Sequence, residues 1–408
     1  MTWQNLSTAI LVIIVLLPAY LLRATLFGIP TTLLEVMLLI VLALGFFEIF
    51  SNKLHTNLIT QQTKQWFVLI VLLLVTATIA LFIAPDHLSA LGIYKAYFIE
   101  PIAFAVLLFV LLTHKHITQN QILTALGISA LFVSVVGIVQ WFIPSGIPIP
   151  WDFERRITSV FEYPNAVGLY LGPIVTVGWI ALLNHFSSQK KLDSLHTIFW
   201  SFVSILGSIA IILAESEAAI VAVLASVFLY ALIQKPTRKL VLIFSILTLA
   251  VIILSPLRTV VFEKLTLQDY SGQVRISQWH EGWNMLKDRP IFGAGLSGYS
   301  NALVPYHKET QYEIFEYPHN IFLNIWSELG LLGLITFTLI ALLILQKLKP
   351  SKSKTTFSLL HFSLSLPPLL TLFIHGLVDV PYFKNDLAVL TWIFLILFIY
   401  ETTRSNKQ

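Results

Sequence analysis

Long apolar runs recur along the whole chain and are separated by short polar connections. Twelve runs are mostly apolar over about 17 or more residues, the length at which an α-helix can cross a hydrocarbon core of about 30 Å. They lie near residues 8–27, 31–50, 66–84, 97–113, 121–143, 160–184, 197–214, 217–234, 240–256, 321–346, 357–378 and 386–402. We therefore predict an all-α polytopic membrane protein with about twelve transmembrane helices, built as a single membrane domain over residues 1–408.

The apolar stretch 197–234 is counted as two of these spans. One helix over it would be about 57 Å long at a rise of 1.5 Å per residue, which is too long for one crossing. That helix would also place Glu215 and Glu217 at the membrane centre, where a carboxylate is costly. We therefore expect a tight turn at these two acids, at one face of the membrane.

The composition excludes a soluble enzyme. Hydrophobic residues make up 57% of the chain and charged residues 11%, whereas an average soluble domain has about 25% charged residues. The chain has no cysteine, so it can form no disulfide, cysteine nucleophile or cysteine metal site. No Lys or Arg precedes the first apolar run and no small-residue cleavage site follows it, so we interpret that run as an uncleaved span.

The distribution of basic residues predicts the orientation. The connections after even-numbered spans, together with the C-terminal tail, hold 14 Lys and Arg, whereas the odd-numbered connections hold 5 when the long one after span nine is left out. Basic residues accumulate on the cytoplasmic side of membrane proteins. We therefore expect a multi-pass protein of the cytoplasmic (inner) membrane, with both termini cytoplasmic and the long connection outside.

The long connection, residues 257–319, is predicted to be a small folded extracytoplasmic unit, which we name the loop module. Charged residues fill 13 of its 63 positions, nearly twice their share in the whole chain. Four apolar residues within it recur at helical spacing: Ile276, Trp279, Trp283 and Leu286. This pattern indicates a short helix in the membrane interface, where tryptophan is common. We expect the helix to end at the Asp288-Arg289-Pro290 sequence.

Three clusters of polar residues near the predicted outer face could carry chemistry. The first contains Arg155 and Arg156, the second Arg275 in the predicted interfacial helix, and the third His319 and Asn320. Arginine at a membrane face commonly anchors a helix to lipid head groups, but its planar guanidinium also binds phosphate through two parallel hydrogen bonds. Arginines on separate elements near one imidazole indicate an anionic ligand held beside a proton acceptor.

His319 is the best candidate for a general base. An unperturbed imidazole has a pKa of about 6.5, so near neutral pH it is mostly uncharged and can accept a proton. The residue type leaves a second interpretation open, in which His319 only caps the tenth span together with Asn320. His280-Glu281 begins a zinc-protease pattern, but Asn284 stands where the second histidine of that pattern is required.

The segment GAGLSG matches the dinucleotide pattern G-x-G-x-x-G literally, with Gly293, Gly295 and Gly298 as its glycines. A dinucleotide fingerprint needs a preceding strand and a following helix, whereas an interfacial helix is predicted to precede this segment. We therefore expect a tight loop, in which backbone N–H groups can face a phosphate.

Several acids lie within or beside predicted spans, where a buried carboxylate is costly and commonly marks function. They are Glu35, Glu100, Glu328, and Asp379 with His375 beside it. Each is either a structural partner for an arginine or a proton-relay group of a transporter, and we favour the structural role.

Three blocks of sequence together resemble the O-antigen ligase and O-antigen polymerase superfamily. The blocks are RITSVFEYPNAVGLYL with Arg156, Pro164, Asn165 and Gly168; VRISQWHEGWNMLKDRPIFGAGLSGY with Arg275, Trp279, Pro290, Gly293 and Gly295; and HNIFLNIWSELGLLGL with His319, Asn320, Glu328, Gly330 and Gly333. Their order, their spacing and the long connection after span nine all fit the superfamily.

The resemblance implies a membrane glycosyltransferase of the GT-C type, which moves a glycan from undecaprenyl diphosphate to an acceptor hydroxyl or amide at the outer face of the membrane. In this superfamily the ligases act on a lipid A–core sugar, the polymerases on another lipid-linked glycan, and related oligosaccharyltransferases on protein. The implied partners are the undecaprenyl-diphosphate-linked donor, a glycan, lipid or protein acceptor, and the lipid bilayer, with no nucleic acid.

The resemblance also implies roles for residues. Arg156 and Arg275 match the arginines that hold the diphosphate, and His319 matches the histidine that activates the acceptor. No metal and no cofactor is implied. The neighbouring motif residues are expected to contact substrate: Arg155, Asn165, Asn320, Glu328, Gly293 and Gly295.

One position departs from the superfamily pattern, and two alternatives stay open. Many members carry Ser-Arg-Gly at the turn between spans seven and eight, where this chain has Ser216-Glu217-Ala218, and we expect Glu217 to pair with Arg155 or Arg156. The residues do not decide between a ligase and a repeat-unit polymerase. The rival of another class is a polysaccharide or lipid transporter or flippase with Glu35, Glu100 and Asp379 as relay groups, but the repeated halves typical of transporters are not seen in the sequence.

Overall fold

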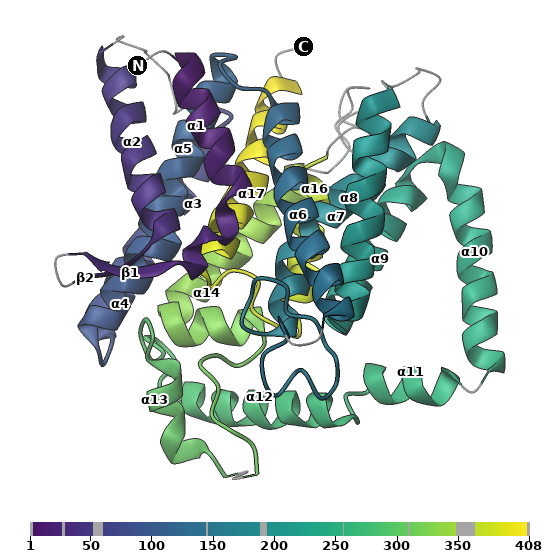
Figure 1. Ribbon diagram of the computed structural model, residues 1–408. Coiled ribbons are helices and arrows are strands. Elements are labelled where there is room, and N and C mark those ends of the chain that lie inside the picture. Colours follow the sequence, from purple (N-terminus) through teal and green to yellow (C-terminus); the bar gives the residue numbers. More distant parts are fainter. Residues whose placement is uncertain are drawn as a thin grey trace.

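The computed structural model describes residues 3–26, 29–51, 60–143, 146–187, 194–255, 257–308, 311–347 and 364–405. Within these ranges the chain forms a bundle of helices, and the helices of the loop module lie across one end of it (Figure 1). The first helix starts and the last helix ends at the opposite end of the bundle (Figure 1).

Before the loop module the elements are α1 (Trp3–Val15), η1 (Leu17–Leu21), β1 (Arg23–Leu26), β2 (Ile29–Thr32), α2 (Leu33–Ser51), α3 (Lys64–Ile83), α4 (His87–Ile93), η2 (Tyr94–Ile99), α5 (Glu100–Thr113), α6 (Gln119–Phe142), α7 (Pro164–Ser187), α8 (Ser194–Leu213), α9 (Glu217–Ile233) and α10 (Lys235–Leu254). The loop module contains α11 (Leu257–Leu265), α12 (Tyr270–Asp288), α13 (Tyr299–Leu303) and η4 (Val304–Tyr306). After it come α14 (Ile321–Lys347), α16 (Leu366–His375) and α17 (Asn385–Ser405).

Among the described residues, eight helices are long and apolar enough to cross a membrane. They are α2, α3, α6, α7, α8, α14, α17 and one continuous helix over His87–Thr113 that joins α4, η2 and α5. The apolar helices α1, α9 and α16 are shorter. Helices of this length and composition confirm the predicted all-α polytopic membrane protein. The expected turn between α8 and α9 is also present, because α8 ends at Leu213 and α9 begins at Glu217.

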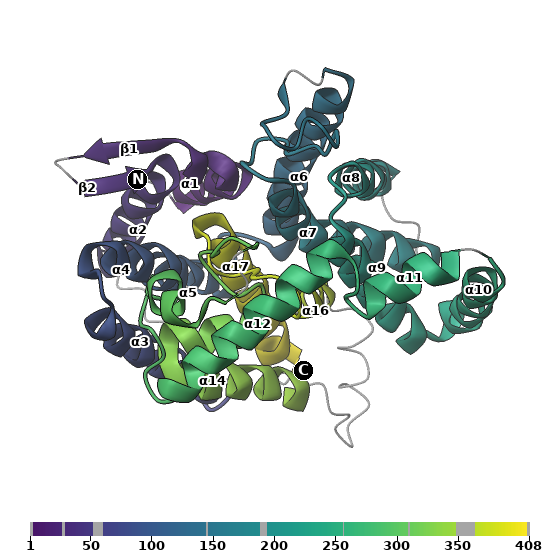
Figure 2. The ribbon, with the colours of Figure 1, turned by 90° about the horizontal axis from the view of Figure 1, so that it is seen from below.

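The first predicted span, 8–27, is wrong in its C-terminal half. The helix α1 ends at Val15, and a short 3-10 turn over Leu17–Leu21 follows it, with Pro18 in its first positions. Proline has no backbone N–H and cannot continue the α-helical hydrogen bonds. The chain then forms an antiparallel hairpin of β1 and β2, which projects from the side of the bundle away from α10 (Figure 2). The predicted span 357–378 is described only from residue 364 onward, where it forms α16.

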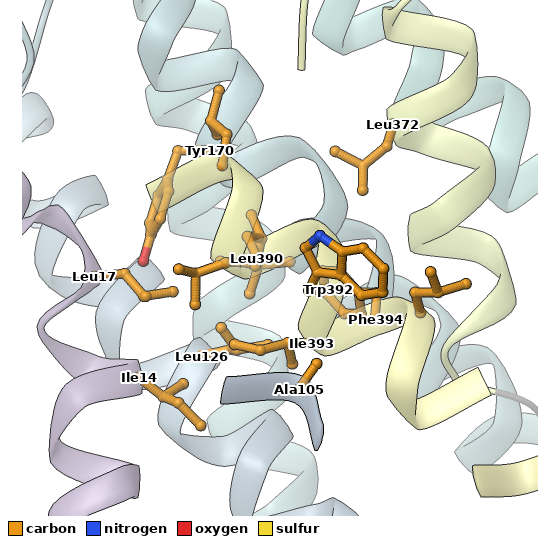
Figure 3. Close-up of a cluster of buried hydrophobic side chains, with 14 of the residues drawn as sticks. Ile14, Leu17, Ala105, Leu126, Tyr170, Leu372, Leu390, Trp392, Ile393 and Phe394 are labelled. Carbon is orange, nitrogen blue, oxygen red and sulfur yellow. The ribbon is translucent and has the colours of Figure 1, made fainter. Parts of the chain in front are cut away.

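The helix α17 occupies the centre of the bundle and carries much of the hydrophobic core. Leu390, Trp392, Ile393 and Phe394 of α17 are buried. Around them lie side chains from α1, η1, α5, α6, α7 and α16: Ile14, Leu17, Ala105, Leu126, Tyr170 and Leu372 (Figure 3). Close packing of this kind holds helices together in a membrane, where lipid is as apolar as the side chains.

The glycine-rich segment after α12 packs between α3 and α14. The N–H of Ala294 donates to the carbonyl of Ser327 at 2.7 Å, and the N–H of Leu296 donates to the carbonyl of Ala80 at 3.3 Å. Gly293 and Gly295 have φ angles of +64° and +78°, a region that costs other residues about 1–2 kcal/mol. A Cβ on Gly293 would lie 2.4 Å from the Ser327 carbonyl oxygen. The glycines are therefore needed for close packing of backbone against backbone.

We expect the substitution Gly293→Ala to lower the stability of the protein by about 2 kcal/mol or more, because the added methyl group meets backbone atoms that cannot move away. Gly92→Ala in α4 is the matched control, since a Cβ there has no atom within 4 Å and alanine is favoured in helices. Apparent Tm in detergent measures both effects. Equal Tm values for the two variants would contradict this account of the glycine-rich segment.

Candidate functional site

The helix α12 carries Arg275 across one end of the bundle, where it contacts α14 (Figure 2). The Asp269 side chain caps the helix by accepting a hydrogen bond from the N–H of Gly272 at 3.2 Å, as N-terminal Asp residues commonly do. The helix ends at Asp288, the residue at which the sequence placed its end. Its buried residues are Gly272, Gln278, Glu281, Gly282, Met285 and Leu286. Met285 and Leu286 pack with Tyr299 and Leu303 of the same loop module.

The Arg275 guanidinium is fixed by the chain around it but keeps donors free. Its Nε donates to the carbonyl of Val378 at 3.0 Å, and its Nη1 donates to the hydroxyl of Ser271 at 2.8 Å. Among the residues that the structure describes, Nη2 has no hydrogen-bond partner. Arg275 therefore has a defined orientation and an unused NH2 group for a ligand.

His319 stands immediately before α14 with a φ of +45°. The residue after it, Asn320, caps the helix, since its side-chain oxygen accepts hydrogen bonds from the N–H groups of Phe322 and Leu323 at 3.0 and 3.1 Å. The Asn320 amide donates to the carbonyl of Leu377 at 2.9 Å. The capping role is thus carried by Asn320, and the imidazole of His319 is left for another purpose.

The imidazole of His319 faces the carboxylate of Asp379. Nδ1 of the ring lies 3.4 Å from Asp379 Oδ1, and the carbonyl of His319 accepts a hydrogen bond from the Trp279 indole at 3.3 Å. The rings of Phe315 and Tyr317 meet the imidazole edge to face. Within the described part of the chain Nε2 has no partner. A carboxylate on Nδ1 and a free Nε2 are the arrangement that a general base requires.

Asp379 lies in the connection between α16 and α17, and its side chain is only 4% exposed. Burial would raise the pKa of its carboxyl group. The hydrogen bond from His319, the nearby imidazoles of His319 and His375, and the N–H of Val380 outweigh burial and lower this pKa to about 2. Asp379 is therefore ionised at neutral pH and can orient and stabilise a protonated imidazole.

Arg156 lies beside the turn between α8 and α9. Its Nε donates to the carbonyl of Ala214 at 3.2 Å, and its Nη2 donates to Asn165 Oδ1 at 3.3 Å. The carboxylates of Glu154 and Glu215 lie 3.6 and 3.9 Å from its nitrogens. Most donors of this guanidinium are therefore directed to the protein itself.

The neighbouring Arg155 has a φ of +53° and an exposed side chain. Its guanidinium carbon lies 4.7 Å from the ring centroid of Trp141, and its Nη2 donates to the carbonyl of the same tryptophan. Arg156 has a similar contact with Trp151, at 5.2 Å. Both arginines are thus supported by an aromatic face.

Two tyrosines connect the segment of Arg156 to the segment of His319. The hydroxyl groups of Tyr163 and Tyr317 are 3.1 Å apart, and the Tyr317 ring contacts the imidazole of His319 at a centroid distance of 5.6 Å. Burial, the largest effect, raises the pKa of Tyr317 to about 12. Its phenol is therefore neutral near pH 7. Among the described residues, no hydrogen bond or ion pair joins Arg156 directly to Arg275 or His319.

The remaining predicted substrate contacts have partners within the protein. Glu328 is buried, and its carboxylate accepts a hydrogen bond from the N–H of Ser297 at 2.6 Å. Gly293 and Gly295 belong to the segment that Glu328 holds, and the N–H of Gly293 donates to the carbonyl of Arg289. In the structure, Gly293 and Gly295 therefore form part of the glycine-rich segment, and Glu328 holds that segment in place.

The expected pairing of Glu217 with Arg155 or Arg156 is wrong. The Glu217 carboxylate lies 2.7 Å from Nζ of Lys264, the last charged residue of α11. The acid of the turn that does approach Arg156 is Glu215. A basic residue in the loop module therefore provides the countercharge, which the superfamily pattern at the turn could not indicate.

Glu35 and Glu100 are the other buried acids in the predicted spans, and among the described residues no hydrogen bond or ion pair joins either of them to His319. Glu35 pairs with Lys95 at 2.9 Å and accepts hydrogen bonds from Thr31 and Asn385, so the cation that it pairs with is a lysine and not an arginine. Both oxygens of Glu100 are buried without a hydrogen-bond partner among the described residues.

Sequence reasoning considered Asp379 apart from His319 and did not consider Tyr163, Tyr317 or Lys384. Nζ of Lys384 lies 3.9 Å from the ring centroid of Tyr163. Lys384 is the single basic residue in the connection before the last predicted span, which was the one signal for it in the sequence. Burial lowers the pKa of Lys384, against the influence of nearby carboxylates led by Asp386.

Comparison with known proteins places these residues in a family context. Residues 202–338 match a family model described as O-antigen ligase. This region runs from α8 to α14 and includes Arg275, His319 and Glu328, whereas Arg156 and Asp379 lie outside it. Residues 202–338 are thus similar to O-antigen ligases, and the eight long apolar helices among the described residues are those of a polytopic membrane protein.

Two proteins with the name "Putative polysaccharide ligase" are similar to this chain. The protein of Rickettsia prowazekii is 28% identical over 176 residues, which is 39% of this chain and 41% of the relative. The protein of Rickettsia conorii is 26% identical over 228 residues, which is 50% of this chain and 52% of the relative. The chain thus spans at most about half of the length of each of these relatives. The comparisons confirm the resemblance to the O-antigen ligase superfamily.

We expect the substitution Asp379→Asn to flatten the dependence of stability on acid pH. A carboxyl group whose folded pKa is about 2 lies below its unfolded value of about 3.9, so its ionised form stabilises the fold above pH 4 and this contribution is lost as the pH falls. The measurement is the apparent Tm in detergent as the pH is lowered from about 6 to about 3. The Tm should fall more steeply for the wild type than for the variant.

The matched control for this prediction is Asp152→Asn, which removes a partly exposed carboxylate from the connection between α6 and α7. Its Tm profile should follow the wild type. If Asp379→Asn also follows the wild type, the ionised Asp379–His319 pair does not contribute to stability.

Proposed function

We propose that this chain is a glycosyltransferase of the cytoplasmic (inner) membrane, which moves a glycan from undecaprenyl diphosphate to an acceptor hydroxyl at the outer face, as an O-antigen ligase does. The observation that carries the proposal is the His319–Asp379 pair, which lies next to the contact of Arg275 with Val378. The family match and the names of the two relatives favour a ligase over a polymerase.

The proposal includes twelve membrane spans. The eight long helices would be joined by α1, α9, α10 and α16, of which α10 has 20 residues. The start of α1 and the end of α17 lie at the same end of the bundle (Figure 1), which an even number of spans requires. The positive-inside rule then puts both ends in the cytoplasm and the loop module outside.

Arg275 would stabilise the leaving group. When the bond between the anomeric carbon and the phosphate oxygen breaks, negative charge builds up on the diphosphate. The unused NH2 group of Arg275 can donate hydrogen bonds to it, and one such donor is typically worth about 3–4 kcal/mol of barrier. Arg156, which the superfamily resemblance also assigns to the diphosphate, has fewer free donors and would act mainly through its charge.

His319 would activate the acceptor. Its Nδ1–H donates to Asp379, so Nε2 can take the proton of the acceptor hydroxyl while the hydroxyl oxygen bonds to the anomeric carbon. The products are the glycosylated acceptor, undecaprenyl diphosphate and a protonated imidazole that Asp379 stabilises. The proton then leaves His319 for solvent before the next turnover.

The loop module would limit hydrolysis of the donor. The helix α12 lies across the end of the bundle (Figure 1). The indole N–H of its Trp279 donates a hydrogen bond to the backbone carbonyl of His319. A cover over the reacting groups excludes water, which would otherwise compete with the acceptor hydroxyl.

We expect Arg275→Ala and His319→Ala each to lower the rate of glycan transfer by about 100-fold or more, because each removes a group that acts in the transition state. The measurement is transfer in proteoliposomes that contain an undecaprenyl-diphosphate-linked glycan and candidate acceptors. Arg289→Ala and His280→Ala are matched controls, since both residues are exposed in the same module, and their rates should stay near that of the wild type.

Near-normal transfer by Arg275→Ala or His319→Ala would remove that residue from the mechanism. If the wild type moves the lipid-linked glycan across the bilayer and forms no new glycosidic bond, the chain is a transporter and the proposed function is wrong.

A second prediction concerns divalent metal ions. Because guanidinium groups would carry the charge of the diphosphate, EDTA in excess over all divalent cations should leave the rate of transfer unchanged. Restoration of an EDTA-inhibited rate by added Mg²⁺ or Mn²⁺ would show instead that a metal ion binds the diphosphate.

A further inference from the structure

Among the residues that the structure describes, the ammonium group of Lys384 has no acceptor. It lies in the connection just before α17, and its closest described contact is the face of the Tyr163 ring, 3.9 Å from Nζ to the centroid. Within the described residues no carboxylate lies within 4.0 Å of Nζ and no oxygen accepts a hydrogen bond from it. The three donors of this half-buried ammonium group are therefore available to a ligand that supplies acceptors.

The acids around Lys384 do not fill this role. Asp379 and Glu162 are close enough to attract the ammonium group. The carboxylate of Asp379, however, is hydrogen-bonded to the imidazole of His319. The carboxylate of Glu162 lies 3.4 Å from the guanidinium of Arg23. Asp386 and Glu316 also act on Lys384 only through space. These carboxylates favour the charged form of Lys384 and leave its donors free.

The position of Lys384 relates it to the candidate base. The ammonium group lies over the Tyr163 ring, and the Tyr163 hydroxyl forms a hydrogen bond with the Tyr317 hydroxyl. The Tyr317 ring in turn contacts the imidazole of His319. The aromatic face of Tyr163 attracts the cation and leaves its N–H groups unoccupied. A ligand near His319 would therefore meet an oriented cation.

We propose that Lys384 binds an anionic group of the glycan substrate, a phosphate or a carboxylate, beside His319. Lysine offers only donors and a positive charge, so an anion is the ligand that satisfies it best. Charge-assisted hydrogen bonds from an ammonium group to such an anion are short and strong. The identity of the substrate as a glycan rests on the proposed function, whereas the anion site rests on the contacts of Lys384.

The test is direct binding of two probes to the full chain in detergent at constant ionic strength. Inorganic pyrophosphate represents the diphosphate of the donor, and glucuronate represents an acidic sugar. We expect Lys384→Gln to weaken binding of at least one probe by about tenfold or more. Lys384→Arg keeps the charge and should bind within about threefold of the wild type. Lys287→Gln is the matched control, because it removes an exposed lysine from the loop module, and its affinities should not change.

The two probes separate the sources of the anion. A loss of affinity for pyrophosphate alone assigns Lys384 to the donor diphosphate, a loss for glucuronate alone assigns it to an acidic sugar, and a loss for both supports a general anion site. Unchanged affinities in Lys384→Gln, or no binding of either probe to the wild type, would overturn the proposal. Thermal unfolding of each variant confirms that it is folded.

The transfer assay keeps this inference separate from the proposed function. If the wild type transfers no glycan but binds an anion in a manner that depends on Lys384, the proposed function fails and the anion site stands. If transfer depends on His319 while both affinities are unaffected by Lys384→Gln, the proposed function stands and the inference fails.

Discussion

The pairing of His319 with Asp379 is the interaction on which the rest of the site depends. A carboxylate that is 4% exposed needs partners for its charge, and His319 and the N–H of Val380 provide them. The same short connection accepts hydrogen bonds from Arg275 at Val378 and from the first residue of α14 at Gly376. One connection between α16 and α17 thus fixes the loop module, the start of α14 and the candidate base relative to one another.

Hydropathy predicted the helices well because a lipid environment constrains helix length directly. An apolar run of sufficient length has few stable conformations in a bilayer other than a helix, so α2, α3, α6, α8 and α17 begin and end within a few residues of their predicted bounds. The turn at Glu215 followed from the cost of a carboxylate at the membrane centre. Hydropathy could not predict the hairpin of β1 and β2, because a short segment at the membrane edge carries no length constraint.

Contacts between segments far apart in the sequence were much less predictable. Spacing along the chain put Arg275 and His319 in the same module, but only the fold brings Asp379 to His319 and Lys264 to Glu217. Residue type was also ambiguous for glycine. The G-x-G-x-x-G segment has the conformational freedom that a phosphate loop needs, yet its N–H groups at Ala294, Leu296 and Ser297 donate to the protein. The same glycines therefore serve the packing of α3 against α14.

The donors that the fold leaves unused indicate what each cation can do. Two nitrogens of Arg156 donate to the protein and a third faces Glu154, so this guanidinium is rigid and has little capacity left for a ligand. Within the described part of the chain, one NH2 group of Arg275 and the three donors of Lys384, which lies over an aromatic ring, have no partner. An unsatisfied cation raises the free energy of the empty protein, and an anion that binds there removes this cost. The binding of an anion beside His319 thus depends on the donors that remain free rather than on the number of arginines in the motifs, and this property cannot be inferred from residue type alone.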